Sequence, residues 1–179
     1  MTRVQLAQST AEQLAQRFFQ ESEGKWRSQR RYYSLRADKA PEEVVSELTV
    51  RYFAAGSPEL LRLASLHNLP AETPLVAGAL TTWESSYVNK TGKPTTGQTL
   101  FGILGNTLYR DRGFMTSKPV TAQYAFNKER TMVLSTEYDG SSFEEELKLI
   151  GNLYRTRQTI ISRAGEEVMI GQYLETRHD

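Results

Sequence analysis

From residue 75 to the C-terminus the chain alternates apolar and polar residues with a period of two, and no helical pattern interrupts it. This period places successive side chains on opposite faces of a β-strand. The breaks carry Gly, Asn, Asp or Pro, which favours tight connections between neighbouring strands. The longest break is a Gly/Lys/Pro/Thr-rich loop over 89–97. The predicted strands here are 75–88, 99–104, 106–114, 120–126, 131–138, 143–150, 153–162 and 167–176.

Two earlier segments, 26–35 and 42–53, show the same alternation and raise the total to about ten strands. A closed antiparallel up-and-down barrel accommodates such a meander without an exposed sheet edge, and it can hold one small ligand. The predicted fold class is therefore all-β with short helices, a barrel of the lipocalin or fatty-acid-binding type. The length of the chain and the absence of linkers or repeats indicate a single domain over 1–179.

Two helices are predicted, one before the first strand and a short one after the second strand. The first spans 9–23, where Ser9 and Thr10 are suited to cap its N-terminus. The second follows Ser57, which is a capping residue, and Pro58, which fits the first helical position.

Composition excludes several classes of function. The net charge is only +1, which gives no broad electrostatic attraction to nucleic acid. The chain has no cysteine and only two histidines, so thiolate chemistry, a metal site and a cofactor are not expected. No apolar run approaches the ~20 residues of a membrane span, and the N-terminus lacks the apolar core of a signal peptide. We expect a soluble protein located in the cytoplasm.

The stretch FEEELKLIGNLYRTRQTIISR, residues 143–163, predicts a hairpin whose first strand has one clear inner face. Phe143, Leu147 and Leu149 share that face because they are separated by even numbers of residues. Glu145 lies on the same face and is therefore predicted to point into the barrel.

The orientation of the second strand depends on the length of the turn. A two-residue turn would pair Glu146 with Arg157 on the outside of the barrel. A three-residue loop over 151–153 would place Arg155 and Arg157 inside with Glu145. Both hairpins are common, so the pattern leaves the two registers open.

If the arginines are inside, they require a counter-ion, because an unpaired buried charge costs several kcal/mol. Glu145 neutralises only one of them. The second would favour an anionic ligand, and a guanidinium matches a carboxylate well. Small barrels of the fatty-acid-binding type hold an acid in this way.

Four segments resemble a known family: SEGKWRSQRRYYSL, TTWESSY, TLYRDRGF and SSFEEELKLIGNLYRTRQTIISRAGEEVMIGQYLE. They are similar to the S-type phycobiliprotein chromophore lyases, the CpcS/CpeS class, over about residues 18–175. The resemblance implies a lipocalin-like barrel and a lyase activity. Such an enzyme binds a linear tetrapyrrole, a bilin such as phycocyanobilin, without a covalent bond. It then attaches this substrate by a thioether to a cysteine of an apo-phycobiliprotein subunit, as in phycocyanin or allophycocyanin.

The same resemblance implies the residues of the site. One departure is Tyr33, which stands where many relatives have a histidine in the first strand, so the resemblance implies no role in proton transfer at this position. A homodimer, or a heteromer with a related lyase subunit, is compatible with the resemblance. The implied catalytic residue is Glu145, and the implied ligand-binding residues are Arg155, Arg157, Trp83, Arg30, Trp26 and Glu175.

Within such a site, Glu145 would form hydrogen bonds with the pyrrole nitrogens or act as a general acid. The apolar interior of the barrel would raise the pKa of its carboxyl group, which suits a general acid. Arg155 and Arg157 would hold propionates, and Trp83 would form a flat wall against a ring. Two alternative functions remain open at this point: a bilin carrier without catalysis and a fatty-acid-type carrier.

Structural roles compete with functional ones at several positions. Trp26 is of a type that more often fills a core than contacts a ligand. Asp111, with Arg110 or Arg112, fits a salt bridge at the rim of the barrel. His67 fits the C-terminal cap of the short helix.

Overall fold

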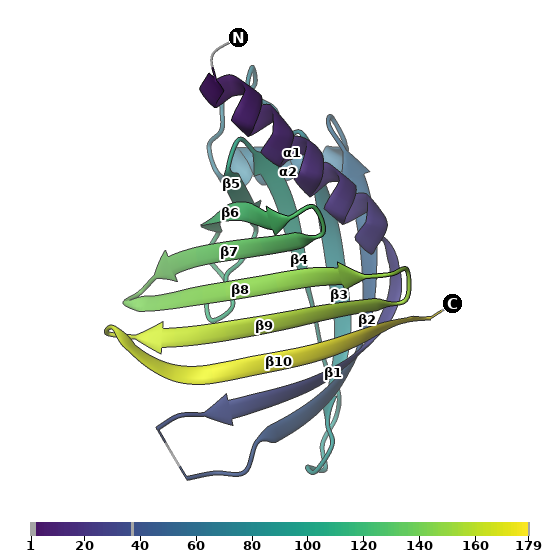
Figure 1. The fold of residues 1–179 in the computed structure, drawn as a ribbon, viewed down its shortest axis with the longest axis vertical. Coiled ribbons are helices and arrows are strands. Elements are labelled where there is room, and N and C mark those ends of the chain that lie inside the picture. Colours follow the sequence, from purple (N-terminus) through teal and green to yellow (C-terminus); the bar gives the residue numbers. More distant parts are fainter. Residues whose placement is uncertain (1–2, 37, 179) are drawn as a thin grey trace.

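A computed structural model describes residues 3–36 and 38–178, and it contains two helices and ten strands (Figure 1). The ten strands form one closed antiparallel barrel in the order β1-β10-β9-β8-β7-β6-β5-β4-β3-β2, which confirms the predicted fold. The elements are α1 (Arg3–Ser22), β1 (Gly24–Ser34), β2 (Glu42–Ala54), α2 (Pro58–Leu66), β3 (Ala77–Tyr87), β4 (Thr95–Leu104), β5 (Thr107–Arg110), β6 (Val120–Lys128), β7 (Thr131–Tyr138), β8 (Ser141–Ile150), β9 (Tyr154–Arg163) and β10 (Glu166–His178).

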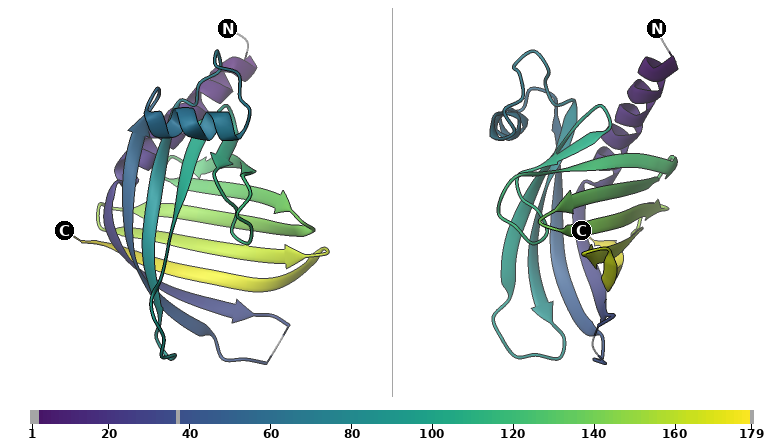
Figure 2. Two further views of the ribbon diagram at one scale, coloured as in Figure 1. Left: turned by 180° about the vertical axis from the view of Figure 1, so that it is seen from behind. Right: turned by 90° about the vertical axis from the view of Figure 1, so that its left-hand side faces the viewer.

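The barrel has two walls with a helix across one end. Strands β6 to β10 form one wall and β1 to β4 the other (Figure 2). Helix α1 lies between the walls at one end and contacts β2, β3, β4 and β6. Its residues Ala15, Phe18 and Phe19 are buried in the main hydrophobic cluster, so this end of the barrel is filled by α1.

Helix α2 packs on the outside of the barrel, where two paired glycines allow close approach. Gly78 and Gly102 face each other on β3 and β4. A Cβ atom on Gly78 would lie 2.5 Å from a methyl group of Leu60, and one on Gly102 would lie 3.0 Å from a methyl group of Leu63, both of α2. Larger residues at these positions would therefore push the helix off the sheet.

Three predicted boundaries were wrong. Helix α1 begins at Arg3, so residues 9 and 10 lie inside it and do not cap it. Strand β4 begins at Thr95, within the predicted loop 89–97. The predicted strand 106–114 ends at Arg110, which leaves β5 with four residues. The start of α2 agrees with prediction, because Ser57 caps it and accepts a hydrogen bond from the Leu60 amide.

The short length of β5 matters for access to the interior. The ladder between β4 and β5 runs only from the pair Phe101–Arg110 to the pair Leu104–Thr107. The first half of β4 therefore extends beyond β5. The segment 111–119, which connects β5 to β6, lies beside this part of the barrel (Figure 2).

Candidate functional site

The β8–β9 hairpin has the three-residue connection. Ile150 pairs with Tyr154, Leu149 with Arg155, and Leu147 with Arg157. Since Leu147 and Leu149 face the interior, Arg155 and Arg157 face it too. The two-residue alternative, which would have placed Arg157 outside, was wrong.

These arginines line a cavity of about 530 Å³ inside the barrel. Its volume lies within the range of small-molecule binding sites. Apolar side chains from α1 and from both walls make up much of its lining, among them Phe18, Leu48, Phe101 and Leu134. The charged residues of the lining are Arg30, Arg110, Arg112, Arg155, Arg157 and Glu175.

Glu145 is the counter-ion of two of these arginines. Its carboxylate is 5% exposed and accepts a hydrogen bond from Arg110 at 2.6 Å and another from Arg157. The three residues come from β5, β8 and β9, so the closure of the barrel brings them together. A carboxylate with two charge-assisted partners is held in one orientation.

The charge state of Glu145 differs from the prediction. Burial raises the pKa of this carboxyl, but the charges of Arg110 and Arg157 outweigh burial and hold its pKa at about 2. The pKa of Arg157 is raised in turn, because Glu145 outweighs the opposing effect of burial. Glu145 is therefore ionised at neutral pH in the ligand-free protein, and the expected raised pKa was wrong.

This low pKa predicts a pH dependence of stability. A carboxyl whose pKa is lowered on folding stabilises the protein above its unfolded value of about 4.5, and the contribution is lost as the pH falls from there to about 2. We expect Glu145→Gln to lack this contribution. The difference in urea midpoint between wild type and Glu145→Gln should be largest near neutral pH and should shrink below about pH 4. A difference that is constant with pH would contradict the assignment.

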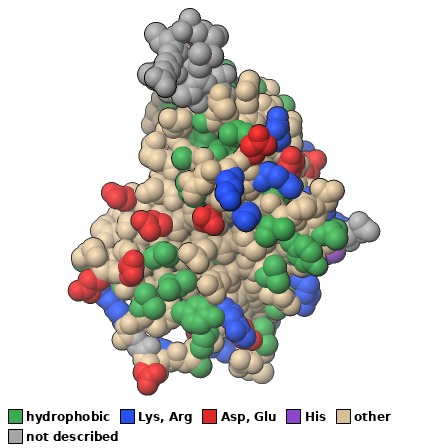
Figure 3. All heavy atoms as spheres, in the orientation of Figure 1, with side chains coloured by type: hydrophobic (Ala, Val, Ile, Leu, Met, Phe, Trp, Pro, Cys, Tyr) green, Lys and Arg blue, Asp and Glu red, His purple; other side chains and the backbone are tan. Residues whose placement is uncertain are grey.

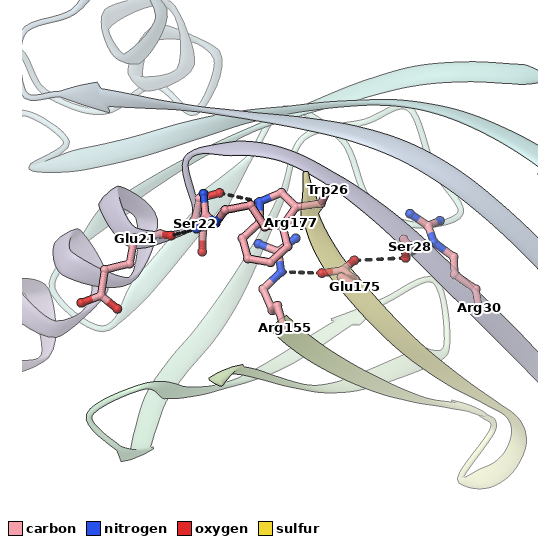
Figure 4. Close-up of polar contacts among 8 residues, drawn as sticks. All are labelled: Glu21, Ser22, Trp26, Ser28, Arg30, Arg155, Glu175 and Arg177. Atoms are coloured by element: carbon pink, nitrogen blue, oxygen red, sulfur yellow. Dashed lines mark hydrogen bonds and ion pairs between the residues drawn. The ribbon is translucent and has the colours of Figure 1, made fainter. Parts of the chain in front are cut away.

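A second buried ion pair joins Arg155 to Glu175 (Figure 4). Glu175 is 1% exposed and also accepts a hydrogen bond from the hydroxyl of Ser28 at 3.2 Å. Burial raises the pKa of Glu175, but the charge and hydrogen bond of Arg155 outweigh it, and the net pKa is lowered. Arg30 donates to the same Ser28 hydroxyl at 3.1 Å, so a continuous polar row crosses from β9 to β1.

Trp26 packs against Arg155 of this polar row and does not line the cavity. It is 0% exposed, and its indole N–H donates to the Ser22 carbonyl at 2.8 Å. The guanidiniums of Arg155 and Arg177 lie 5.0 and 4.3 Å from the centre of its ring (Figure 4). Its ring is thus a core side chain that packs on Arg155, and a contact with a ligand stays a prediction.

The remaining predicted residues fall into two groups. Trp83 and Arg30 line the cavity, and both are half-buried. Tyr33 is absent from the cavity lining among the described residues. The cavity thus contains Arg30, Trp83, Arg155, Arg157 and Glu175, with Glu145 behind two of its arginines.

Arg110 was missed as a site residue. The rim salt bridge proposed for it was wrong: Arg110 is 7% exposed and pairs with Glu145, while Asp111 accepts a hydrogen bond from the Leu100 amide at 3.0 Å. His67 is the C-cap of α2, as predicted, and its ring nitrogen is also 2.8 Å from the Arg110 carbonyl oxygen. The spacing of Leu108 and Arg110 in the sequence could have identified Arg110, because residues two apart on a strand lie on the same face, here the inner one.

Positive charge exceeds negative charge in this cavity. Arg112 is exposed at the edge of the cavity and is left out of this count. Of the other described charged residues, Arg30, Arg110, Arg155 and Arg157 are opposed by Glu145 and Glu175, which leaves two positive charges in excess. The Nε atoms of Arg110 and Arg157 are also buried without a hydrogen-bond partner in the described part of the chain. An anionic ligand with two carboxylates would match this excess.

Comparison with known proteins shows the family of the chain. Residues 15–178 match the family model described as CpeS-like protein.

The chain belongs to the CpeS-like family.

A protein of a Nostoc species named "Putative phycocyanobilin lyase CpcS 2" is 59% identical over 160 residues, which cover 89% of this CpeS-like chain and 88% of the relative. A protein of a Picosynechococcus species named "Putative chromophore lyase CpcV" is 51% identical, with 89% of this chain and 79% of the relative covered. The solved S-type phycobiliprotein lyase of Guillardia theta is 23% identical. It superposes with a TM-score of 0.77 over 100% of this chain and 99% of its own, and thus shares the fold.

Among the described residues there is neither a helix suited to cross a membrane nor a side-chain group suited to hold a metal ion. Neither helix of this CpeS-like protein combines the length and apolar character that crossing a bilayer requires. Within the same residues, His, Asp and Glu side chains do not gather in groups of three or more that would hold a metal ion.

Proposed function

We propose that this protein is a bilin lyase, which binds phycocyanobilin or a related bilin in the barrel and attaches it to a cysteine of a phycobiliprotein subunit. The observation that carries the proposal is the excess of two positive charges among the buried and half-buried groups of a cavity of about 530 Å³. A bilin carries two propionates and a chain of pyrrole rings. A fatty acid has one carboxylate and would leave one arginine unmatched.

The arginines orient the substrate in this proposal. Arg155 and Arg157 hold propionates, with Arg110 and Arg30 on the neighbouring walls, and Trp83 packs against a ring. Holding one face of the bilin toward the incoming thiol is itself catalytic, because it replaces a random encounter by a fixed geometry.

Glu145 acts as an ionised carboxylate. Its negative charge, held next to the cavity behind Arg110 and Arg157, favours the protonated, more electrophilic tetrapyrrole. The thiol then adds across the ethylidene double bond on ring A, with a new C–S bond and no change of oxidation state overall. The chain has no cysteine, so the bilin is held without a covalent bond and the nucleophile comes from the acceptor.

The partners follow from the same chemistry. Apo-subunits of phycocyanin or allophycocyanin type supply the cysteine, and the protein meets them in the cytoplasm. A homodimer, or a heteromer with a related lyase subunit, stays a prediction.

The deciding experiment is an absorption and fluorescence titration of the purified protein with phycocyanobilin, followed by addition of an apo-phycobiliprotein subunit. We expect a red-shifted, sharpened band and then a fluorescent adduct on the acceptor that survives denaturation. Binding without an adduct would favour a carrier. An unchanged bilin spectrum would overturn the proposal.

The arginine clamp predicts that Arg157→Ala weakens phycocyanobilin binding by at least about tenfold, since a charge-assisted contact contributes about 1.5–3 kcal/mol. The matched control is Arg163→Ala on the same strand, because Arg163 is exposed. The dissociation constant of phycocyanobilin from Arg163→Ala, measured by the absorption titration, should equal that of the wild type. Equal affinities for both variants would contradict the clamp.

A further inference from the structure

The cavity opens toward solvent at the segment 111–119, here called the mouth loop. Six consecutive residues of this loop, 112–117, line the cavity. All of the exposed residues in the lining come from it, whereas the other lining residues are buried or half-buried. The exposed ones are Arg112, Phe114, Met115 and Ser117.

The mouth loop has a defined conformation against the barrel wall. The Gly113 amide donates to the Thr116 carbonyl at 3.0 Å, and the Met115 amide donates to the Tyr138 hydroxyl at 2.8 Å. The ring of Phe114 lies 5.9 Å from that of Phe143, which stacks on Tyr138 at 4.9 Å. The loop is therefore presented as a preformed surface, which lowers the entropic penalty of binding a partner.

Two large apolar side chains remain open to solvent on this surface. Phe114 is 48% exposed and Met115 is 57% exposed. Aromatic and methionine side chains are enriched in the cores of protein interfaces. Their place beside the cavity is significant because the chain has no cysteine, so the thiol of the acceptor must reach the bilin through the mouth.

We infer that Phe114 and Met115 form the docking surface for the acceptor subunit, against an apolar patch next to the acceptor cysteine. The inference rests on the proposed function and adds to it the face on which the partner binds. Arg112 and Lys118 flank the two apolar residues and are exposed. The partner patch is therefore an apolar centre with carboxylates at its rim, the usual arrangement of a protein interface.

The test compares two double variants with the same kind of substitution. Phe114→Ser/Met115→Ser removes the proposed surface. Leu153→Ser/Tyr154→Ser is the matched control, because these residues are 57% and 44% exposed. They belong to the tip of the β8–β9 hairpin, where apolar side chains also gather on the surface (Figure 3).

Bilin affinity is measured by titration, and adduct formation is measured over a range of acceptor concentrations. We expect the mouth-loop variant to raise the KM for the acceptor by at least about tenfold, with a much smaller change in bilin affinity, and the control to match wild type. An unchanged KM, or a loss of bilin affinity as large as the rise in KM, would overturn the docking surface. A larger effect in the control would move the docking site to the hairpin. If wild-type protein forms no adduct, the proposed function fails, and this inference fails with it.

Discussion

Glu145→Gln is expected to remove the red-shifted, sharpened band of bound phycocyanobilin and to slow adduct formation by at least about a hundredfold. The substitution preserves the size and shape of the side chain and removes its charge. Glu145 is 5% exposed and held ionised by Arg110 and Arg157. In the proposed mechanism this charge stabilises the protonated bilin, which is the form that the thiol attacks.

The matched control is Glu146→Gln, one residue further along β8. Glu146 is exposed on the outer face of the barrel and pairs with Gln158. The chemical change is identical, but it does not reach the cavity. Both the bilin spectrum and the adduct rate of this variant should match the wild type.

Loss of the fold must be separated from loss of function, because Glu145→Gln leaves Arg110 and Arg157 without their counter-ion. The absorption spectrum at saturating bilin measures the effect on the bound pigment. Circular dichroism of the free protein shows whether the fold is kept. The two arginines still attract the propionates, so affinity should fall far less than the rate. A wild-type spectrum at saturation would rule out the role proposed for Glu145.

The fold was predictable because each strand carries its own signal. Alternation in β8 placed Phe143, Leu147 and Leu149 inside without reference to any other part of the chain. The errors fall where a local signal is weak. Residues 111–114 continue an apparent alternation, yet β5 ends at Arg110, because the chain leaves the sheet to form the mouth loop.

The site was only partly predictable, since its geometry depends on one turn. Adding Leu153 to the loop reverses the face of every residue in β9. Sequence alone gave both registers, and only the packing of the whole barrel selects one. The same holds for Arg110, whose partner Glu145 lies 35 residues away and becomes a neighbour only when the barrel closes.

The charge state of Glu145 was a second property of the site that could not be predicted from the sequence. An apolar barrel raises the pKa of a lone carboxyl, and the prediction followed from that rule. With two arginines against it, the balance reverses. The number of charged neighbours, which the sequence did not provide, decides the sign of the shift.

The Arg155–Glu175 pair predicts the largest effect on stability. Glu175→Gln leaves the Arg155 guanidinium buried without a counter-ion, and we expect the free energy of unfolding to fall by about 3–5 kcal/mol. The side chains of Arg155 and Glu175 are only 8% and 1% exposed, so solvent does little to screen the lost interaction. Urea unfolding near neutral pH measures the change.

Removing both charges should be less harmful than removing one. We expect Glu175→Gln/Arg155→Met to recover most of the lost stability, because no unpaired charge remains. A double variant whose loss equals the sum of the two single losses would show that the pair is not coupled.

Bilin binding to the Glu175→Gln variant tests whether Arg155 contacts a propionate, because a propionate can replace the carboxylate that this substitution removes. Bound phycocyanobilin should raise the urea midpoint of Glu175→Gln more than that of the wild type, since a propionate on Arg155 stabilises the protein most where Glu175 no longer neutralises this arginine. The outer-face variant Glu146→Gln should gain no more than the wild type. If bilin stabilises Glu175→Gln no more than it stabilises the wild type and Glu146→Gln, Arg155 does not contact a propionate. The excess positive charge must then be matched elsewhere in the cavity.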